Sequence, residues 1–175
     1  MSLKKGKRKL TKRQKNNTIL ELTTFRSYKK LKTAISNNTS NCVNITQSYL
    51  SEIEKNQHLN IFIEVFEKES LERAKQIDKK IKQGKAGRLA GMVIGIKDNI
   101  CYKDHKVTAS SKILKNFVSL YSSTVVERLL NEDAIIIGRL NCDEFAMGSG
   151  NENTIYGTVK NPTNNKKVAG GSSGG

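Results

Sequence analysis

MVIGI (92–96) and AIIIGRL (134–140) are the two apolar segments that decide the fold. Each is short, rich in β-branched residues and bounded by glycine or polar residues, which predicts a strand buried on both faces. The segment between them has apolar residues at helical spacing after a capping Ser123, so a helix is expected over 124–131. Its inward-facing side chains are expected to be Val125, Val126, Leu129 and Leu130. Strand, helix and strand in this order predict an α/β fold with helices covering the sheet.

The part of the chain before residue 92 predicts two helices, a strand and a third helix. The first helix begins after Ser27, and the second spans 44–55 with Asn44 as its cap. Alternating β-branched and aromatic residues predict a short strand at 61–65, and a charged helix follows at 68–83.

The formal net charge of +15 is concentrated at the start of the chain. Eight Lys or Arg residues and no acidic residue occupy the first fifteen positions, so residues 1–26 are predicted to be a basic, disordered extension. A specific RNA contact by this extension stays open. Residues 27–175 are expected to form the folded part.

The sequence contains neither an apolar run of transmembrane length nor the apolar stretch of a secretory signal. No membrane partner is therefore expected. A cytoplasmic location is predicted, and organellar targeting stays open because no acidic residue precedes Glu21.

Lys97 is the first candidate for a chemical role, because it directly follows the first predicted strand and precedes Asp98. A lysine at the mouth of a buried strand can lose solvation, which favours a neutral amine that acts as a general base. An ion pair with Asp98 or another carboxylate is the structural alternative.

The second candidate is GGSSGG at residues 170–175. Glycine pairs allow tight backbone turns that present the hydroxyl groups between them, although a flexible linker has the same composition. Neither of the two common glycine-rich phosphate loops, GxxxxGK[ST] and GxGxxG, occurs, so the sequence does not support nucleotide binding by this chain.

A third candidate segment follows the second predicted strand. Met147, Gly148 and Ser149 lie beyond the carboxyl end of that strand, where open α/β sheets bind ligands, so a pocket wall and an ordinary surface loop are both open. The adjacent Asp143 and Glu144 point in different directions, and a solvated or capping role is expected for them.

Metal and disulfide sites are not predicted. The cysteines are odd in number, far apart and without CxxC or Cys/His spacing: Cys42, Cys101 and Cys142. His58 and His105 are expected to be isolated surface residues.

Four segments in order resemble the amidase-signature family: GMVIGIKDNI (91–100), VTASSKIL (107–114), TVVERLLNEDAIIIGRLNCDEFAMGS (124–149) and KNPTNNKKVAGGSSGG (160–175). Within the family, KDNI, DEFAMGS, NEN and the closing GGSSGG are most similar to the A subunits of tRNA-dependent amidotransferases. The resemblance implies an amidase-signature fold with a mixed central sheet covered by helices. Residues 27–175 would be its N-terminal part, with the domain incomplete in this chain and truncated after GGSSGG. Ala169, in place of the usual proline, and GMV, in place of the usual GIP, depart from the pattern.

The same resemblance implies a Ser-Ser-Lys triad that hydrolyses amides. Lys97 would be the general base and Ser172 the bridging serine that follows a cis peptide bond. The nucleophilic serine belongs to a DTGGS-type segment that this chain lacks, so the chain alone is expected to be inactive. Ser173 joins the segment 147–149 as a candidate substrate contact.

The resemblance also implies partner subunits and a tRNA substrate. The complete enzyme would release ammonia from glutamine, and B and C subunits would use it to amidate Glu-tRNA(Gln) or Asp-tRNA(Asn), with ATP and Mg²⁺ bound by the B subunit. No cofactor is expected in this chain itself. A hydrolase of small-molecule amides and an inactive truncated fragment are the alternatives.

Overall fold

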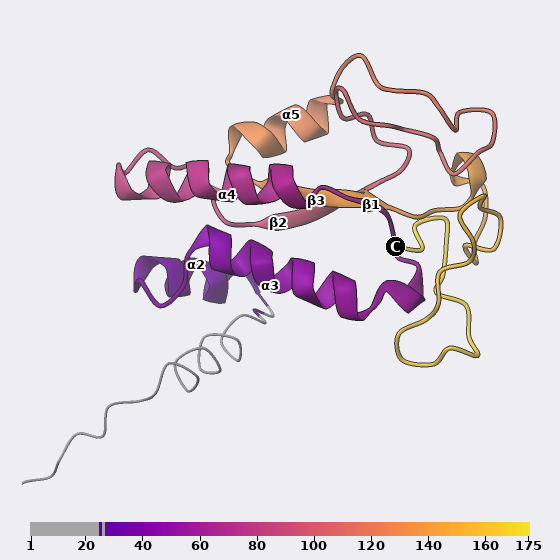
Figure 1. Ribbon diagram of the computed structural model, residues 1–175, viewed down its shortest axis with the longest axis horizontal. Helices are drawn as coiled ribbons and strands as arrows, with labels where there is room; N and C mark the ends of the chain where they lie inside the picture. The colour runs from indigo at the N-terminus through magenta and orange to yellow at the C-terminus, as the bar shows by residue number, and fades with distance from the viewer. Residues whose placement is uncertain (1–24, 26) are drawn as a thin grey trace, which may run out of the picture.

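A computed structural model describes residues 25 and 27–175 (Figure 1). The extension expected over residues 1–26 therefore lies outside the described residues, apart from residue 25. The described elements in chain order are α2 (Tyr28–Ser36), α3 (Cys42–Lys55), η1 (Gln57–Leu59), β1 (Phe62–Val65), α4 (Glu67–Lys82), β2 (Val93–Lys97), α5 (Thr124–Asn131), β3 (Ile135–Leu140) and η2 (Glu144–Ala146). No helix among these is long and apolar enough to cross a lipid bilayer.

The sheet has the strand order β1-β3-β2. β2 and β3 are parallel and joined through α5, as the strand, helix and strand pattern predicts, while β1 runs antiparallel to β3. The expected α/β fold with a mixed sheet is therefore confirmed. The prediction that both apolar segments are buried on both faces is right only for β3, because β2 lies at an edge of the described sheet and is half-buried along most of its length.

The two faces of β3 contact different helices. Ile136 packs with Val126 of α5 on one face, and Ile135 packs with residues of α3 and α4 on the other. Figure 1 shows α5 and α3 on opposite sides of the sheet. The expectation that Val125 also faces inward is wrong, since its side chain is 51% exposed. Val125 is one position from the fully buried Val126, and adjacent helical residues point in different directions.

The starts of α2 and α3 test the capping residues that the sequence predicts. The Ser27 side chain accepts a hydrogen bond from the Lys30 backbone N–H, so Ser27 caps α2 as predicted. The predicted cap of α3, Asn44, is wrong. Asn41 is the cap, and its side-chain oxygen accepts from the Asn44 N–H at 2.8 Å. Asp78 of α4 accepts from the N–H groups of the first two residues of α3, so part of the helix start is satisfied by a residue distant in sequence.

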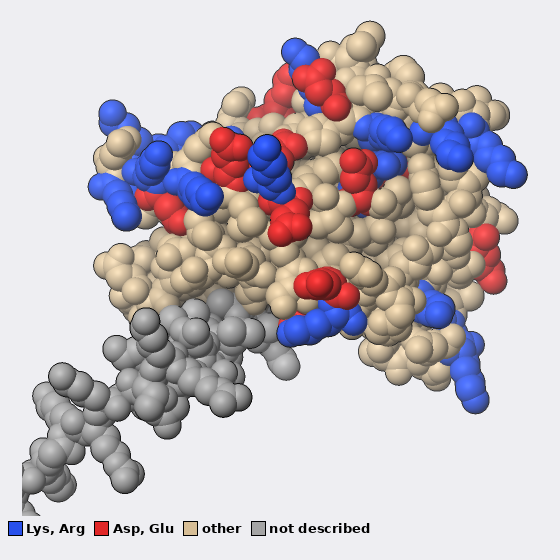
Figure 2. All heavy atoms as spheres, in the orientation of Figure 1, with Lys and Arg blue, Asp and Glu red and all other residues tan. Residues whose placement is uncertain are grey.

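The charged side chains at the two ends of α4 are placed favourably for the helix dipole. Glu67 and Glu69 lie in the first turn, and the last turn carries Lys79, Lys80 and Lys82. This arrangement stabilises a helix because its amino end is electropositive and its carboxyl end electronegative. Figure 2 shows Lys and Arg side chains gathered at the end of the molecule where α4 finishes.

An apolar groove of about 580 Å³ lies between the second half of α3, η1 and the nearby face of the sheet. Val93, Gly95 and Ile137 line its floor, and Tyr49 and Ile53 line its wall. None of the site residues predicted from the sequence borders it.

Asp133 ties α4 to the turn before β3. It is buried, and its carboxylate accepts from Lys80 Nζ at 2.6 Å and from the Gly87 N–H at 2.8 Å. Burial disfavours the charged carboxylate, but the hydrogen bonds from Lys80 and Gly87 outweigh it and hold the pKa of Asp133 below its ordinary value.

Replacing Asp133 with Asn is expected to lower the free energy of unfolding at pH 7 by about 1–3 kcal/mol, because it removes a buried acceptor of charged and backbone donors. Since the folded pKa of Asp133 is depressed, its stabilisation is present above the ordinary aspartate pKa of about 4 and is lost as the pH falls through the folded value. Urea unfolding at pH 7 and at about pH 2 checks this prediction. A difference between the two proteins that is as large in acid as at pH 7 would contradict it. Glu52→Gln, in an exposed pair with Lys55, is the control.

Candidate active site

Lys97 and Ser172 meet at the carboxyl end of β2. Lys97 is the last residue of that strand, and its Nζ donates a hydrogen bond to Ser172 Oγ at 2.7 Å. The two residues are 75 positions apart in the sequence. The structure therefore brings together the lysine of KDN and the first serine of GGSSGG.

The segment that carries Ser172 is fixed to the end of β3. The Asp143 N–H donates to the Ser172 carbonyl oxygen at 3.0 Å, and Cys142 and Ser173 form an antiparallel bridge. The Gly171–Ser172 peptide bond is cis. In the structure, GGSSGG is thus paired with neighbouring backbone and is not a free linker.

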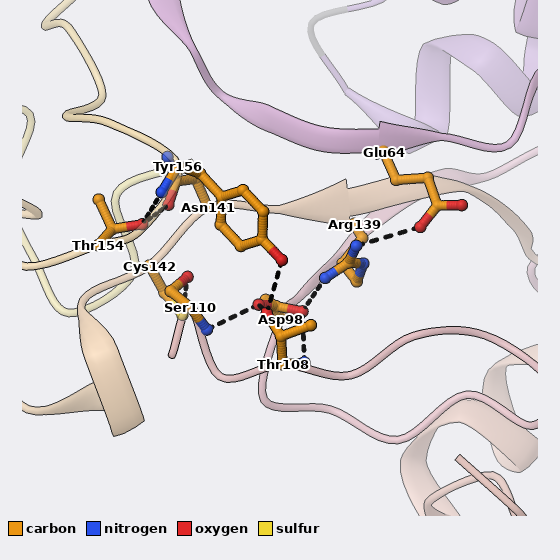
Figure 3. Close-up of polar contacts among 9 residues, drawn as sticks. All are labelled: Glu64, Asp98, Thr108, Ser110, Arg139, Asn141, Cys142, Thr154 and Tyr156. Atoms are coloured by element: carbon orange, nitrogen blue, oxygen red, sulfur yellow. Dashed lines mark hydrogen bonds and ion pairs between the residues drawn. The ribbon is translucent and has the colours of Figure 1, made fainter. Parts of the chain in front are cut away.

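Lys97 does not pair with Asp98, which was the structural alternative for this lysine. Within residues 25 and 27–175, no carboxylate forms an ion pair with Lys97. The side chain of Asp98 is fully buried and bonds instead to Arg139 of β3 and to Thr108 and Ser110 (Figure 3).

Arg139 is the centre of the charged network drawn in Figure 3. It is 3% exposed, its Nη1 donates to Asp98 and its Nη2 donates to Glu64 at 3.1 Å. Burial alone would lower the pKa of Arg139, but the adjacent Asp98 carboxylate outweighs this and raises it. The Tyr156 hydroxyl completes the network through Thr108 Oγ1 at 3.0 Å.

Asp143 is buried, so the solvated role expected for it is wrong. It occupies the N-cap position of η2, but its side chain makes no capping hydrogen bond there. Its carboxylate accepts from the backbone N–H groups of Asn151 and Asn153 at 3.0 and 3.2 Å. A side chain at Gly148 or Gly171 would overlap it, since a Cβ at either position would lie 2.3 Å from an Asp143 carboxyl atom. Asp143 therefore bonds to residues 151 and 153 and packs closely against Gly148 and Gly171, directly beside Ser172. Glu144 is exposed.

The four candidate substrate contacts are only partly brought to this site. Ser149 lies beside Gly171, because its carbonyl carbon is 2.7 Å from where a Gly171 Cβ would be, and Gly148 packs on Asp143. Ser173 is exposed next to the half-buried Ser172, and Met147 is 77% exposed. The apolar groove beside α3 includes none of them.

Cysteine and histidine side chains do not form a metal site in the part of the chain that the structure describes. Cys142 is buried with its Sγ 3.4 Å from Ser110 Oγ, and burial is the main cause that raises the pKa of its thiol. His105 is not isolated as expected: its ring stacks on Tyr102 with centroids 4.1 Å apart, and its Nε2 lies 2.8 Å from Glu69 Oε2. No short-range sequence spacing reveals this cluster, because Glu69 is 36 residues away.

A sequence model of the amidase family matches residues 44–175, and the chain belongs to this family. The curated relatives are named as the A subunit of glutamyl-tRNA(Gln) amidotransferase. The one from Chlorobium phaeobacteroides strain BS1 is 45% identical over 86% of this chain, and the one from Chlorobium chlorochromatii is 45% identical over 85%. This chain spans about a third of their length, 32% of each.

Solved structures of the family have the same fold. A bacterial aryl acylamidase of the amidase-signature family matches with a TM-score of 0.81 and 25% identity over 87% of this chain and 32% of its own. The glutamyl-tRNA(Gln) amidotransferase A subunit of Thermotoga maritima matches with a TM-score of 0.59 and 29% identity over 76% of this chain and 29% of its own. The chain thus has the amidase-signature fold in part.

Proposed function

We propose that this chain is part of the glutamine-hydrolysing A subunit of a tRNA-dependent amidotransferase, a carbon–nitrogen ligase with glutamine as amido donor. The observation that carries the proposal is the 2.7 Å hydrogen bond between Lys97 Nζ and Ser172 Oγ, formed by the two residues of this chain that match the triad. The names and 45% identity of the Chlorobium relatives support the choice within the family.

In the proposed reaction, Ser172 relays a proton to Lys97. A nucleophilic serine outside this chain loses its proton to Ser172 Oγ, whose own proton passes to the neutral amine of Lys97. The serine oxygen attacks the carboxamide carbon of glutamine. The C–N bond then breaks as Lys97 returns a proton through Ser172 to the leaving nitrogen, which departs as ammonia. Water then hydrolyses the acyl-enzyme to glutamate and restores the serine.

The partners of the proposed enzyme are B and C subunits and a mischarged tRNA, either Glu-tRNA(Gln) or Asp-tRNA(Asn). The B subunit would bind ATP and Mg²⁺, and this chain would supply the ammonia. The proposed site of action is the cytoplasm. Substrate contacts from Gly148, Ser149 and Ser173 are part of the proposal, because these residues lie near Ser172 or next to it.

A second candidate function is the hydrolysis of small-molecule amides without tRNA. The observation that supports it is the match to the aryl acylamidase over 87% of this chain with a TM-score of 0.81. Both candidates use Lys97 and Ser172 in the same way and differ in substrate.

A chimeric enzyme separates the two candidates. This chain is joined to the downstream two-thirds of the Chlorobium phaeobacteroides relative, which supplies the rest of the domain, and is assembled with the B and C subunits. We refer to this protein as the completed enzyme. Ammonia release from glutamine, with no cleavage of an acyl anilide, is the expected result. Anilide cleavage without glutamine hydrolysis would favour the second candidate, and neither activity would contradict both.

A further inference from the structure

The buried pair of Asp98 and Arg139 has no part in the proton path described above. Both side chains are almost entirely removed from water, with Asp98 at 0% and Arg139 at 3% exposure. A buried ion pair adds little net stability compared with apolar residues of similar volume. Asp98 directly follows Lys97, and Arg139 lies opposite Ile96 on the neighbouring strand. This position at the ends of β2 and β3 points to a role at the site. Figure 3 shows the pair with its hydrogen-bond partners.

The Asp98 carboxylate is fully engaged by groups other than Lys97. Oδ1 accepts from Arg139 and from the Thr108 N–H at 3.0 Å, and Oδ2 accepts from the Ser110 N–H at 2.8 Å and from the Thr108 hydroxyl. Four donors are about as many as a carboxylate can accept. The carboxylate next to Lys97 in sequence is therefore not available to pair with it, and Lys97 reaches Ser172 instead.

The charge of Asp98 would nevertheless affect Lys97 if nothing offset it. A carboxylate close to a lysine favours the ammonium form, whereas a base must be neutral to accept a proton. The charged and titratable groups near Lys97 come from the end of β2, from β3 and from the residues after β3: Asp98, Arg139, Cys142 and Asp143. In this set Arg139 carries the positive charge that contacts Asp98 directly. Glu64, the other partner of Arg139, has a side chain that is 44% exposed and is therefore screened by solvent.

We propose that Arg139 is a positioning residue for Lys97: by neutralising and holding Asp98, it leaves Lys97 bonded to Ser172 and able to lose its proton. The importance of Arg139 for catalysis rests on the proposed function. The influence of Arg139 and Asp98 on Lys97 does not rest on it, because all three residues lie in this chain.

The test measures how acetylation of Lys97 depends on pH, and it needs no catalytic assay. The 175-residue chain is labelled with a trace of acetic anhydride from about pH 6 to about pH 11, a range that spans the titration of lysines. Acetylation of Lys97 is followed by peptide mass spectrometry, since only the neutral amine reacts. Three variants are compared with the parent: Arg139→Met, Asp98→Asn and the double variant. Arg88→Met, which breaks an exposed ion pair, is the control.

The two single variants are expected to move the labelling curve in opposite directions. Arg139→Met leaves a negative Asp98 beside Lys97, so the curve moves to higher pH by about one unit, and Asp98→Asn leaves a positive Arg139, so it moves to lower pH. The double variant is expected to label as the parent does, because both charges are gone, and Arg88→Met is expected to label like the parent. General damage to the fold would not produce shifts of opposite sign that cancel.

Unchanged curves in all variants, or shifts of the same sign in both single variants, would overturn the proposal. If a single variant does not fold, as judged by circular dichroism, the remaining single variant and the neutral double variant still decide it. The expected shifts together with a completed enzyme that hydrolyses no amide would leave this inference standing and contradict only the proposed function.

Discussion

Replacing Lys97 with Ala is expected to lower kcat for glutamine hydrolysis by the completed enzyme about 10³-fold, since a general base contributes about 10²–10⁴-fold to such reactions. The hydrogen bond from Lys97 Nζ to Ser172 Oγ is lost in this variant, and Ser172 then has no group in the described contacts to which it can pass a proton. The KM for glutamine is expected to change little, because Lys97 acts on the serine and not on the substrate.

The measurement is the initial rate of ammonia release as a function of glutamine concentration. Lys85→Ala, which removes an exposed lysine from the turn after α4, is the matched control and is expected to retain the parent rate. A kcat for Lys97→Ala within about threefold of the parent would exclude Lys97 as the base, since that is far below the contribution of a general base.

The second large effect is expected for Gly171→Ala. A Cβ at this position would lie 2.3 Å from Asp143 Oδ2 and 2.7 Å from the Gly150 backbone nitrogen, so the backbone must move. Overpacking of this kind costs about 1–3 kcal/mol of stability. Displacement of Ser172 by about 1 Å relative to Lys97 is expected to lower kcat about 10²-fold.

Urea unfolding and ammonia release measure the two consequences separately. Gly84→Ala is the control, because Gly84 has a φ of +67° and no atom within 4 Å of the added Cβ. This control is expected to lose only about 1 kcal/mol through backbone strain and to keep its activity. Parent-like stability and activity for Gly171→Ala would contradict the close packing of GGSSGG against Asp143.

Local sequence patterns predicted the secondary structure of the described residues well. The strands around MVIGI and AIIIGRL and the helix between them lie within one residue of their expected bounds, because burial and helical spacing are properties of neighbouring residues. Asn44 was the wrong cap of α3. The structure places the cap at Asn41, and Asp78 of α4 completes the helix start from 36 residues away.

The candidate site was less predictable from residue patterns. KDN could equally have been part of an ion pair, and GGSSGG a flexible linker. Only their resemblance to the amidase-signature family linked Lys97 with Ser172. The contact itself spans 75 residues. The buried positions of Asp98, Arg139 and Asp143 also depend on contacts made by the folded chain, and no spacing in the sequence marks them. A charged residue inside an apolar strand, as in AIIIGRL, is the one signal that could have directed attention to Arg139.

Proton relay through Ser172 is tested by the rate of ammonia release from glutamine by the completed enzyme carrying Ser172→Ala. Loss of the hydroxyl removes the oxygen that contacts Lys97 at 2.7 Å, so we expect a fall of about 10³-fold in kcat with an unchanged thermal unfolding temperature. Ser36→Ala, at the end of α2, is the matched control and is expected to behave as the parent. A Ser172→Ala enzyme that releases ammonia at the parent rate would exclude the proton relay, because transfer through Ser172 would then not be required.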